Sequence, residues 1–140
     1  MKLEKILVPI DGSEYSARAA EYSLSCAEQY QSEVILLHCH KPIIGYSVEP
    51  DYEVVRNRIL EKADRLLDKY RSMYDGKGIR HREIICDPPP AQAICQIAKE
   101  ENIDTIIMGS RGKTDWEGLL VGSVTHKVLQ LSPCPVLVVP

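Results

Sequence analysis

The sequence lacks several features that would assign it to a particular class of protein. It has no CxxC pair, and its cysteines are odd in number, so we expect reduced cytosolic thiols and no disulfide framework. No apolar run approaches the roughly 18 residues of a membrane-spanning helix. The apolar stretch near the start is too short for a signal peptide. These absences predict a cytoplasmic protein with no membrane partner.

An excess of positive charge is also absent. The formal net charge is −3 at pH 7, whereas a general nucleic-acid binder carries a basic face, so no nucleic-acid partner is expected. A small phosphate ligand stays compatible with this charge, because it needs only local donors. The chain shows no internal repeat and no low-complexity tract, and its 140 residues predict one domain over residues 1–140.

Short apolar segments alternate with helical patterns along the chain. Strands are predicted at 5–10, 34–38, 82–86, 103–108 and 136–139, and the continuous apolar runs of the first two indicate burial on both faces. Helices are expected after Ser13 as the N-cap, over 51–74, after the prolines at 88–90, and from about Gly122; a loop is expected over 41–50. This alternation predicts an α/β fold: a doubly wound, five-stranded parallel sheet with helices on both faces, in three layers.

The spacing of apolar residues predicts the inner faces of two of these helices. In the longest helix the stripe consists of Val55, Ile59, Ala63, Leu66 and Tyr70. In the last helix the inward positions are Val124, Val128 and Leu131.

Doubly wound sheets bind ligands at the carboxyl ends of strands, where the winding direction reverses. Two strand ends carry suitable residues, at 9–12 (PIDG) and 108–112 (MGSRG). The second continues into a Gly-Lys-Thr triplet, which invites comparison with a Walker A phosphate loop. That loop needs the spacing GxxxxGK[ST], which requires a glycine at position 107, where the chain has Ile107. The dinucleotide pattern GxGxxG is excluded too, because the first strand is followed by Gly12 alone.

A different spacing fits a phosphate site better. Gly109-x2-Gly112-x9-Gly122-Ser123 brackets a loop that leaves a strand and returns to the start of a helix. Gly109 and Gly112 would let the backbone approach a ligand, or adopt positive φ if required. Residues 122–124 would open the helix, whose free N–H groups and dipole favour an anion. The Ser123 hydroxyl could cap that helix or donate to a phosphate, and Arg111 would add positive charge.

Together these motifs resemble the universal stress protein family, in its ATP-binding branch. The resemblance spans the whole chain: the start ILVPIDGS, the segment VILLHC, the G-x2-G-x9-G-[ST] pattern and the ending SPCPVLVV. It implies a Rossmann-like fold of the adenine-nucleotide α-hydrolase type, with strand order 3-2-1-4-5 and four helices. It also implies a nucleotide between the ends of strands one and four.

The resemblance further implies a set of binding residues and a ligand. The nucleoside side would be formed by Pro9, Ile10 and Asp11, with the backbone near Cys39 bordering the adenine. The ribose and phosphates would be held by Met108, Gly109, Arg111, Gly112, Gly122, Ser123, Val124 and Thr125. The implied ligand is ATP, or ADP or AMP, with Mg²⁺ or Mn²⁺ bridging its phosphates. The implied assembly is a homodimer that pairs the last strands, Val136–Val139.

Function and several residues keep alternative interpretations. The leading function is a nucleotide-binding regulatory module of the stress response, because no catalytic base is evident. The competing function is a slow ATP hydrolase or an autophosphorylating enzyme, and a third is a partner-binding dimer with a vestigial site. Asp11 could serve as a general base, and His126 could contact phosphate or face solvent. Trp116 could be a lid, a partner contact or a packed surface aromatic.

The segment His38-Cys39-His40 suggests a metal site at first sight. Strand alternation sends the two histidines to one face and Cys39 to the other, and no third ligand is placed by the sequence. Cys39 fits a small core residue better than a reactive thiol. No metal ligand is therefore assigned.

Overall fold

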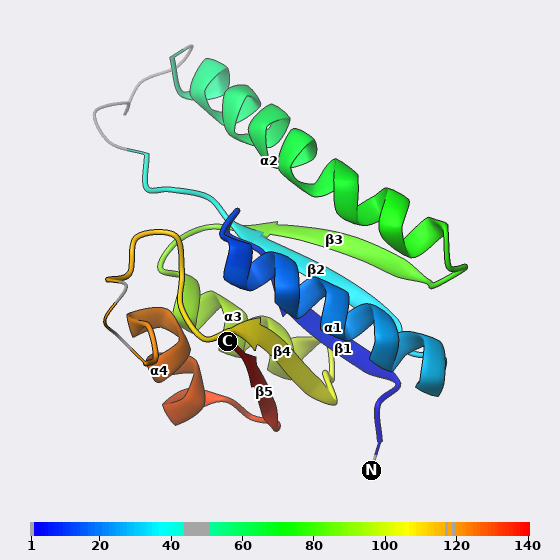
Figure 1. The fold of residues 1–140 in the computed structure, drawn as a ribbon. Coiled ribbons are helices and arrows are strands. Elements are labelled where there is room, and N and C mark those ends of the chain that lie inside the picture. The colour runs from blue at the N-terminus through cyan, green and yellow to red at the C-terminus, as the bar shows by residue number, and fades with distance from the viewer. Residues whose placement is uncertain (1, 44–50, 117, 119) are drawn as a thin grey trace.

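The computed structural model describes residues 2–43, 51–116, 118 and 120–140. Five strands alternate with four helices in these ranges (Figure 1). In chain order they are β1 (Lys5–Pro9), α1 (Glu14–Tyr30), β2 (Glu33–Cys39), α2 (Asp51–Asp75), β3 (His81–Cys86), α3 (Pro90–Glu100), β4 (Thr105–Gly109), α4 (Ser123–Leu131) and β5 (Val136–Val139). The strands form one parallel sheet in the order β3-β2-β1-β4-β5, which confirms the expected fold and strand order. Most of the expected loop, residues 44–50, lies outside the described residues.

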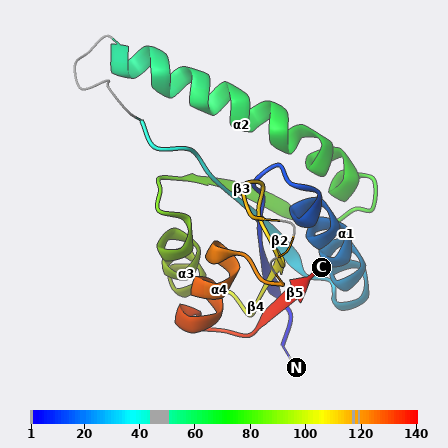
Figure 2. The ribbon, with the colours of Figure 1, turned by 60° about the vertical axis from the view of Figure 1, so that its left-hand side comes forward.

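The helices α1 and α2 pack on one face of the sheet and α3 and α4 on the other, which makes three layers (Figure 2). Side chains alternate along a strand, so Ile6 and Val8 of β1 pack with α1 and α2, while Leu7 between them packs with α3 and α4. The central strands β1 and β2 are buried over most of their length. This double burial explains why their sequences are continuous apolar runs rather than alternating patterns.

The helix α2 packs on the sheet through its second half only. The buried residues are Ala63, Leu67, Tyr70 and Tyr74. The expected stripe was therefore wrong at Val55 and Ile59, which are only half-buried, whereas the half-buried Leu66 packs against the core as expected. The first turns of α2 diverge from the sheet in both views, so none of the described strands lies beneath them (Figures 1 and 2).

Within the described ranges, no helix combines the length and apolar character that a membrane span requires.

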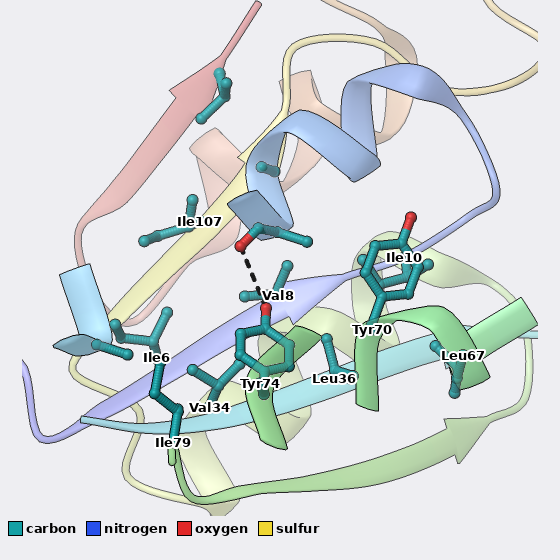
Figure 3. Packing of buried hydrophobic residues seen from close by; sticks show 14 residues of the cluster. Ile6, Val8, Ile10, Val34, Leu36, Leu67, Tyr70, Tyr74, Ile79 and Ile107 are labelled. Atoms are coloured by element: carbon teal, nitrogen blue, oxygen red, sulfur yellow. Dashed lines mark hydrogen bonds between the residues drawn. The ribbon is translucent and has the colours of Figure 1, made fainter. Parts of the chain in front are cut away.

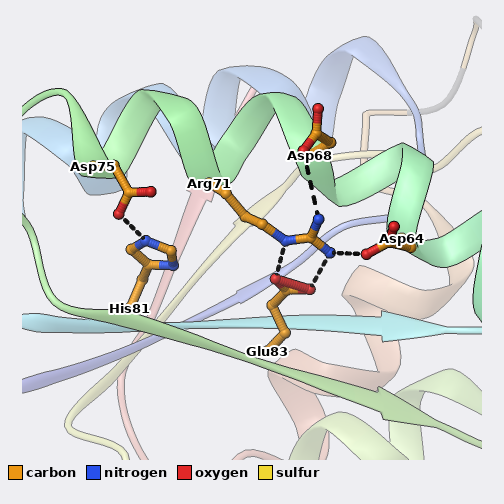
Figure 4. Close-up of polar contacts among 6 residues, drawn as sticks. All are labelled: Asp64, Asp68, Arg71, Asp75, His81 and Glu83. Carbon is orange, nitrogen blue, oxygen red and sulfur yellow. Dashed lines mark hydrogen bonds and ion pairs between the residues drawn. The ribbon is translucent and has the colours of Figure 1, made fainter.

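Polar contacts attach α2 to the edge strand β3 (Figure 4). Arg71 donates two hydrogen bonds to Glu83, one of them at 2.8 Å from Nη2 to Oε2, and a third to Asp64 at 2.7 Å. His81 Nε2 lies 2.7 Å from Asp75 Oδ1. A two-pronged guanidinium–carboxylate pair fixes orientation as well as distance, so these contacts set how α2 lies along β3.

The helix α4 buries Thr125 and Val128, with Val124 half-buried as expected. The expectation for Leu131 was wrong, since this side chain is 54% exposed. Leu131 is the last residue of α4, and the chain turns away into an extended Ser132 immediately after it.

Two tyrosines one turn apart on α2 provide a matched test of buried hydrogen bonding (Figure 3). The Tyr74 hydroxyl lies 2.6 Å from the Ser23 hydroxyl and 3.3 Å from the Ala20 carbonyl, and burial raises the pKa of Tyr74 to about 12. The Tyr70 hydroxyl is buried with no hydrogen-bond partner among the described residues.

Substituting each tyrosine with phenylalanine should therefore change stability in different directions. We expect Tyr74→Phe to lower the free energy of unfolding by about 1 kcal/mol, because the buried Ser23 hydroxyl loses one of its two partners and keeps only the Ala20 carbonyl. Tyr70→Phe should leave stability unchanged or raise it by up to about 1 kcal/mol, because an unpaired buried hydroxyl is removed. Urea unfolding of both variants checks this, and a Tyr74→Phe protein as stable as Tyr70→Phe would contradict it.

Candidate functional site

The carboxyl ends of β1 and β4 lie side by side at the point where the sheet reverses its winding. Ile6 and Leu7 of β1 pair with Thr105 and Ile106 of β4, while β2 lies on the other side of β1. Two connections leave these ends together, residues 10–13 toward α1 and residues 110–122 toward α4 (Figure 1). The sheet topology thus brings together the two segments that the sequence singled out.

Asp11 joins these two connections. One carboxylate oxygen accepts a hydrogen bond from the Ser13 N–H at 2.9 Å, and the other accepts one from the Lys113 N–H at 2.9 Å. Gly12 has a φ of +87°, which a residue with a side chain rarely adopts. Ser13 then accepts from the Ser16 N–H and caps α1, as expected. Asp11 therefore lies at the predicted place and fixes the two loops relative to each other.

The apolar residues that flank the candidate site direct their side chains largely into the core, so they border the site mainly with their backbone. Ile10 is buried in the cluster beneath α1 and α2, and Met108 in the cluster beneath α3 and α4. Pro9 is half-buried at the end of β1. The Ile10 carbonyl accepts a hydrogen bond from His38 Nδ1, 2.7 Å away, which gives His38 a structural role beside this site.

Gly109 is required by packing. A Cβ at this position would lie 2.7 Å from Cβ and 2.8 Å from the carbonyl carbon of Tyr15 in α1. The Gly109 carbonyl accepts a 2.8 Å hydrogen bond from the buried Thr125 hydroxyl, which holds the first turn of α4 against the end of β4. Positive φ is not the reason for this glycine, because among the described glycines only Gly12 and Gly78 have it.

Gly112 and Gly122 enclose the carboxylate of Asp115. The Gly112 N–H donates to Asp115 Oδ2 at 2.5 Å, and the Ser123 N–H lies 3.5 Å from Oδ1, a long hydrogen bond. A Cβ on Gly122 would lie 2.0 Å from the same Oδ2. Asp115 thus lies between the two halves of the glycine motif. Sequence reasoning missed it, although an acidic residue three positions after Gly112 was the available signal.

The start of α4 differs from the expected capping. Gly122 is the N-cap, and Ser123 is the first helical residue, so of the two roles considered for the Ser123 hydroxyl the capping role is wrong. That hydroxyl lies at the exposed helix start, and Val124 behind it packs against the apolar cluster. The positive end of the helix faces the Asp115 carboxylate.

Arg111 packs on an aromatic residue that the sequence did not single out. Its guanidinium carbon lies 4.6 Å from the centroid of the Tyr15 ring, and that of Arg18 lies 4.8 Å from the same ring. These are cation–π distances. The remaining candidates on this side, Trp116 and His126, are exposed.

Cys39 lies at the carboxyl edge of the sheet beside β1, since Leu37 pairs with Pro9 and Cys39 extends the strand past it. It pairs in register with Cys86 of β3. A hydrogen bond from the Cys86 thiol lowers the pKa of Cys39, and the same contact raises the pKa of Cys86.

His40 follows the end of β2 and contacts Asp87, which follows the end of β3. Burial opposes its protonation, but hydrogen bonds to the Lys41 carbonyl and the Asp87 carboxylate leave the pKa of His40 raised. Its Nδ1 lies 2.7 Å from the Lys41 carbonyl and its Nε2 lies 2.6 Å from Asp87 Oδ1. Throughout the part of the chain that the structure describes, no three His, Cys, Asp or Glu side chains are grouped so as to hold a metal ion.

The thiol pair predicts an order of cysteine reactivity. Burial raises the pKa of Cys26, Cys95 and Cys134, so Cys39 should be alkylated first by iodoacetamide at pH 8. Cys86→Ala should slow alkylation of Cys39 severalfold because the thiol donor is lost, whereas Cys86→Ser keeps a hydroxyl donor and should change it less. Peptide mass spectrometry over a time course measures each site. Equal rates at Cys39 in both variants would refute this role of Cys86.

The chain is similar to known proteins over nearly its whole length. The model of the universal stress protein family matches residues 2–140. Universal stress protein MJ0531 of Methanocaldococcus jannaschii is 32% identical over 138 residues, which cover 97% of this chain and 81% of that protein. Universal stress protein YxiE of Bacillus subtilis is 33% identical over 144 residues, with 96% and 97% covered.

Solved structures share the fold. Protein MJ0577, a universal stress protein of M. jannaschii, superposes with a TM-score of 0.90 at 35% identity, covering 99% of this chain and 96% of that one. A universal stress protein in complex with cAMP has a TM-score of 0.76 at 23% identity, with 98% and 97% covered. A family member from Arabidopsis thaliana with AMP bound has a TM-score of 0.70 at 21% identity, with 96% and 90% covered.

Proposed function

We propose that this chain, which belongs to the universal stress protein family, binds an adenine nucleotide where the loops after β1 and β4 meet. The ligand is ATP, or ADP or AMP. The protein acts in the cytoplasm as a small regulatory module of the stress response, and nucleotide occupancy is its signal. The likeness to family structures described with cAMP and AMP supports this choice of ligand class.

The single observation that carries the proposal is the anion cradle at the start of α4. Backbone N–H groups of Gly112 and Ser123 converge on one negatively charged group, the Asp115 carboxylate. Backbone donors at a helix N-terminus bind phosphate by the same chemistry. The cradle lies beside Asp11, so a phosphate held there would place the rest of a nucleotide along the carboxyl edge of the sheet.

In this proposal each residue takes the role that the family resemblance implies for it. Asp11 contacts the nucleoside, and the backbone near Cys39 borders the adenine. The segment 109–112 approaches the ribose and phosphates, and the segment 122–125 holds the phosphates. Because Ile10, Met108 and Thr125 are buried, they act by positioning the backbone.

A divalent cation would accompany the nucleotide rather than belong to the protein alone. Mg²⁺ and Mn²⁺ prefer oxygen ligands and bind phosphates together with one or two carboxylates. The carboxylate of Asp11 approaches Gly112, within 2.9 Å of the position of an added Cβ. This carboxylate suits a cation that bridges the phosphates.

Binding is favoured over turnover as the main activity. Both carboxylates at the site accept hydrogen bonds from backbone amides, which suits positioning better than proton transfer. The alternative, a slow ATP hydrolase or an autophosphorylating enzyme, predicts sustained release of phosphate. The binding module predicts stoichiometric retention of nucleotide with negligible product.

A glycine pair within one loop tests the site. Gly122→Val should weaken ATP binding at least about tenfold, since a Cβ there would lie 3.1 Å from the Arg111 Cα and would fill the space, now 2.0 Å from Asp115 Oδ2, that a phosphate needs. Gly118→Val is the matched control, because a Cβ at that position meets nothing within 4 Å. Isothermal titration with ATP, circular dichroism and a phosphate-release assay are run on both variants and the unmodified protein.

Two results would count against the proposal. Equal ATP affinity in folded Gly122→Val and Gly118→Val would remove the site assignment. Multiple turnovers per protein molecule would favour the enzyme. Mass spectrometry of the denatured, purified protein adds an independent check, because the proposal predicts a co-purified adenine nucleotide.

We also propose a homodimer that pairs β5 with its copy. β5 is an edge strand of the sheet, and an apolar edge needs a partner or a cover. The carbonyls of Pro135 and Val139 accept hydrogen bonds from the β4 side, so by strand alternation the backbone groups of Val136 and Val138 face the free edge.

Backbone substitution at this edge separates a dimer from a monomer. Val138→Pro removes an outward N–H and should yield a monomer, whereas Val138→Ala keeps the N–H and should leave the dimer intact. Sedimentation velocity across a concentration series measures both. If the unmodified protein is a monomer, the proposed dimer is excluded, and the proposed nucleotide site is unaffected.

A further inference from the structure

The carboxylate of Asp115 lies where the proposed function places a nucleotide phosphate. Its two oxygens meet the N–H of Gly112 at 2.5 Å and the N–H of Ser123 at 3.5 Å, one donor from each half of the glycine motif. The Asp115 N–H in turn lies 3.4 Å from the Gly112 carbonyl, which closes a tight turn around the side chain. The cradle thus contains a negative charge that the chain itself supplies.

The surrounding backbone is shaped for this carboxylate. An added Cβ would lie 2.0 Å from Asp115 Oδ2 at Gly122 and 3.3 Å from it at Gly112. A side chain at Gly122 would therefore collide with the carboxylate, and one at Gly112 would crowd it. This steric fit is independent of the hydrogen bonds, and it shows that the absence of a side chain at Gly122 makes room for the Asp115 carboxylate.

We infer that Asp115 is a built-in competitor of the nucleotide phosphates, an autoinhibitory contact of the site; this inference rests on the proposed function. Two negative groups cannot share the same pair of donors without strong repulsion, so a phosphate enters only when the carboxylate leaves. If Asp115 occupies the cradle in nine molecules out of ten, the apparent affinity for a phosphorylated nucleotide falls about tenfold. Adenosine carries no phosphate and escapes this competition.

Titration of charge and size variants with two ligands tests the inference. Asp115→Ala removes the carboxylate, and Asp115→Asn keeps its shape and its acceptor oxygen without the charge. Glu14→Gln is the matched control, because Glu14 is an exposed carboxylate in the first turn of α1 that makes no contact with the cradle. Each protein is titrated with ATP and with adenosine, in EDTA so that no divalent cation contributes.

The expected pattern depends on the phosphate. Asp115→Ala should bind ATP about tenfold more tightly than the unmodified protein, with Asp115→Asn between them. Adenosine affinity should stay unchanged in both variants, and Glu14→Gln should bind both ligands as the unmodified protein does. Unchanged or weaker ATP binding in both Asp115 variants, with adenosine still bound, overturns the inference and leaves the proposed function standing. Failure of every protein to bind either ligand overturns the proposed function and the inference together.

A measurement without nucleotide completes the test. The Gly112 N–H should exchange with solvent deuterium several-fold more slowly in the unmodified protein than in Asp115→Ala, since the carboxylate protects it. NMR exchange rates report this single amide, and circular dichroism confirms that the variant is folded. Equal exchange in the two folded proteins overturns the inference.

Discussion

The close approach of α1 to β4 is the contact on which the candidate site depends. Tyr15 lies directly against Gly109, and a methyl group at residue 109 would already be too close to the backbone of α1. Because α1 starts just after β1, this contact fixes the β1 loop relative to the end of β4. The same Gly109 carbonyl receives the Thr125 hydroxyl, so α4 is anchored at the same point. One residue without a side chain therefore sets the positions of both helices.

Charged residues add a second set of contacts around the candidate site. Asp11 accepts backbone hydrogen bonds from its own loop and from the loop after β4, so the two connections behave as one unit. Arg111 and Arg18 both lie over the ring of Tyr15, the residue that packs against Gly109. The start of α4 adds its dipole. The result is a small region of convergent donors at the carboxyl edge of the sheet, on a chain whose net charge is negative.

Much of this fold is predictable because strands that are buried on both faces have continuous apolar sequences. Apolar runs predicted all five strands, and the resemblance supplied their order. Helix faces were less predictable: the stripe of α2 holds only where a strand lies beneath it, and Leu131 is exposed because α4 ends there. Periodicity describes a helix in isolation, whereas burial depends on the length of the neighbouring element. Asp115 and Tyr15 were missed for a related reason, since their roles arise from contacts between segments far apart in sequence or across a loop.

The glycine motif shows most clearly what a spacing can and cannot specify. Spacing predicted where the backbone needs room, and Gly109, Gly112 and Gly122 do lie at points where a Cβ would collide. The occupant of that room is a separate question. At Gly109 it is the Tyr15 backbone and side chain. At Gly112 it is the carboxylate of Asp11 from the loop after β1, with that of Asp115 slightly farther away, and at Gly122 it is the carboxylate of Asp115. Carboxylate and phosphate oxygens accept hydrogen bonds from the same kind of N–H donor, so the acidic residue inside the motif occupies the donors that the proposed nucleotide site would use.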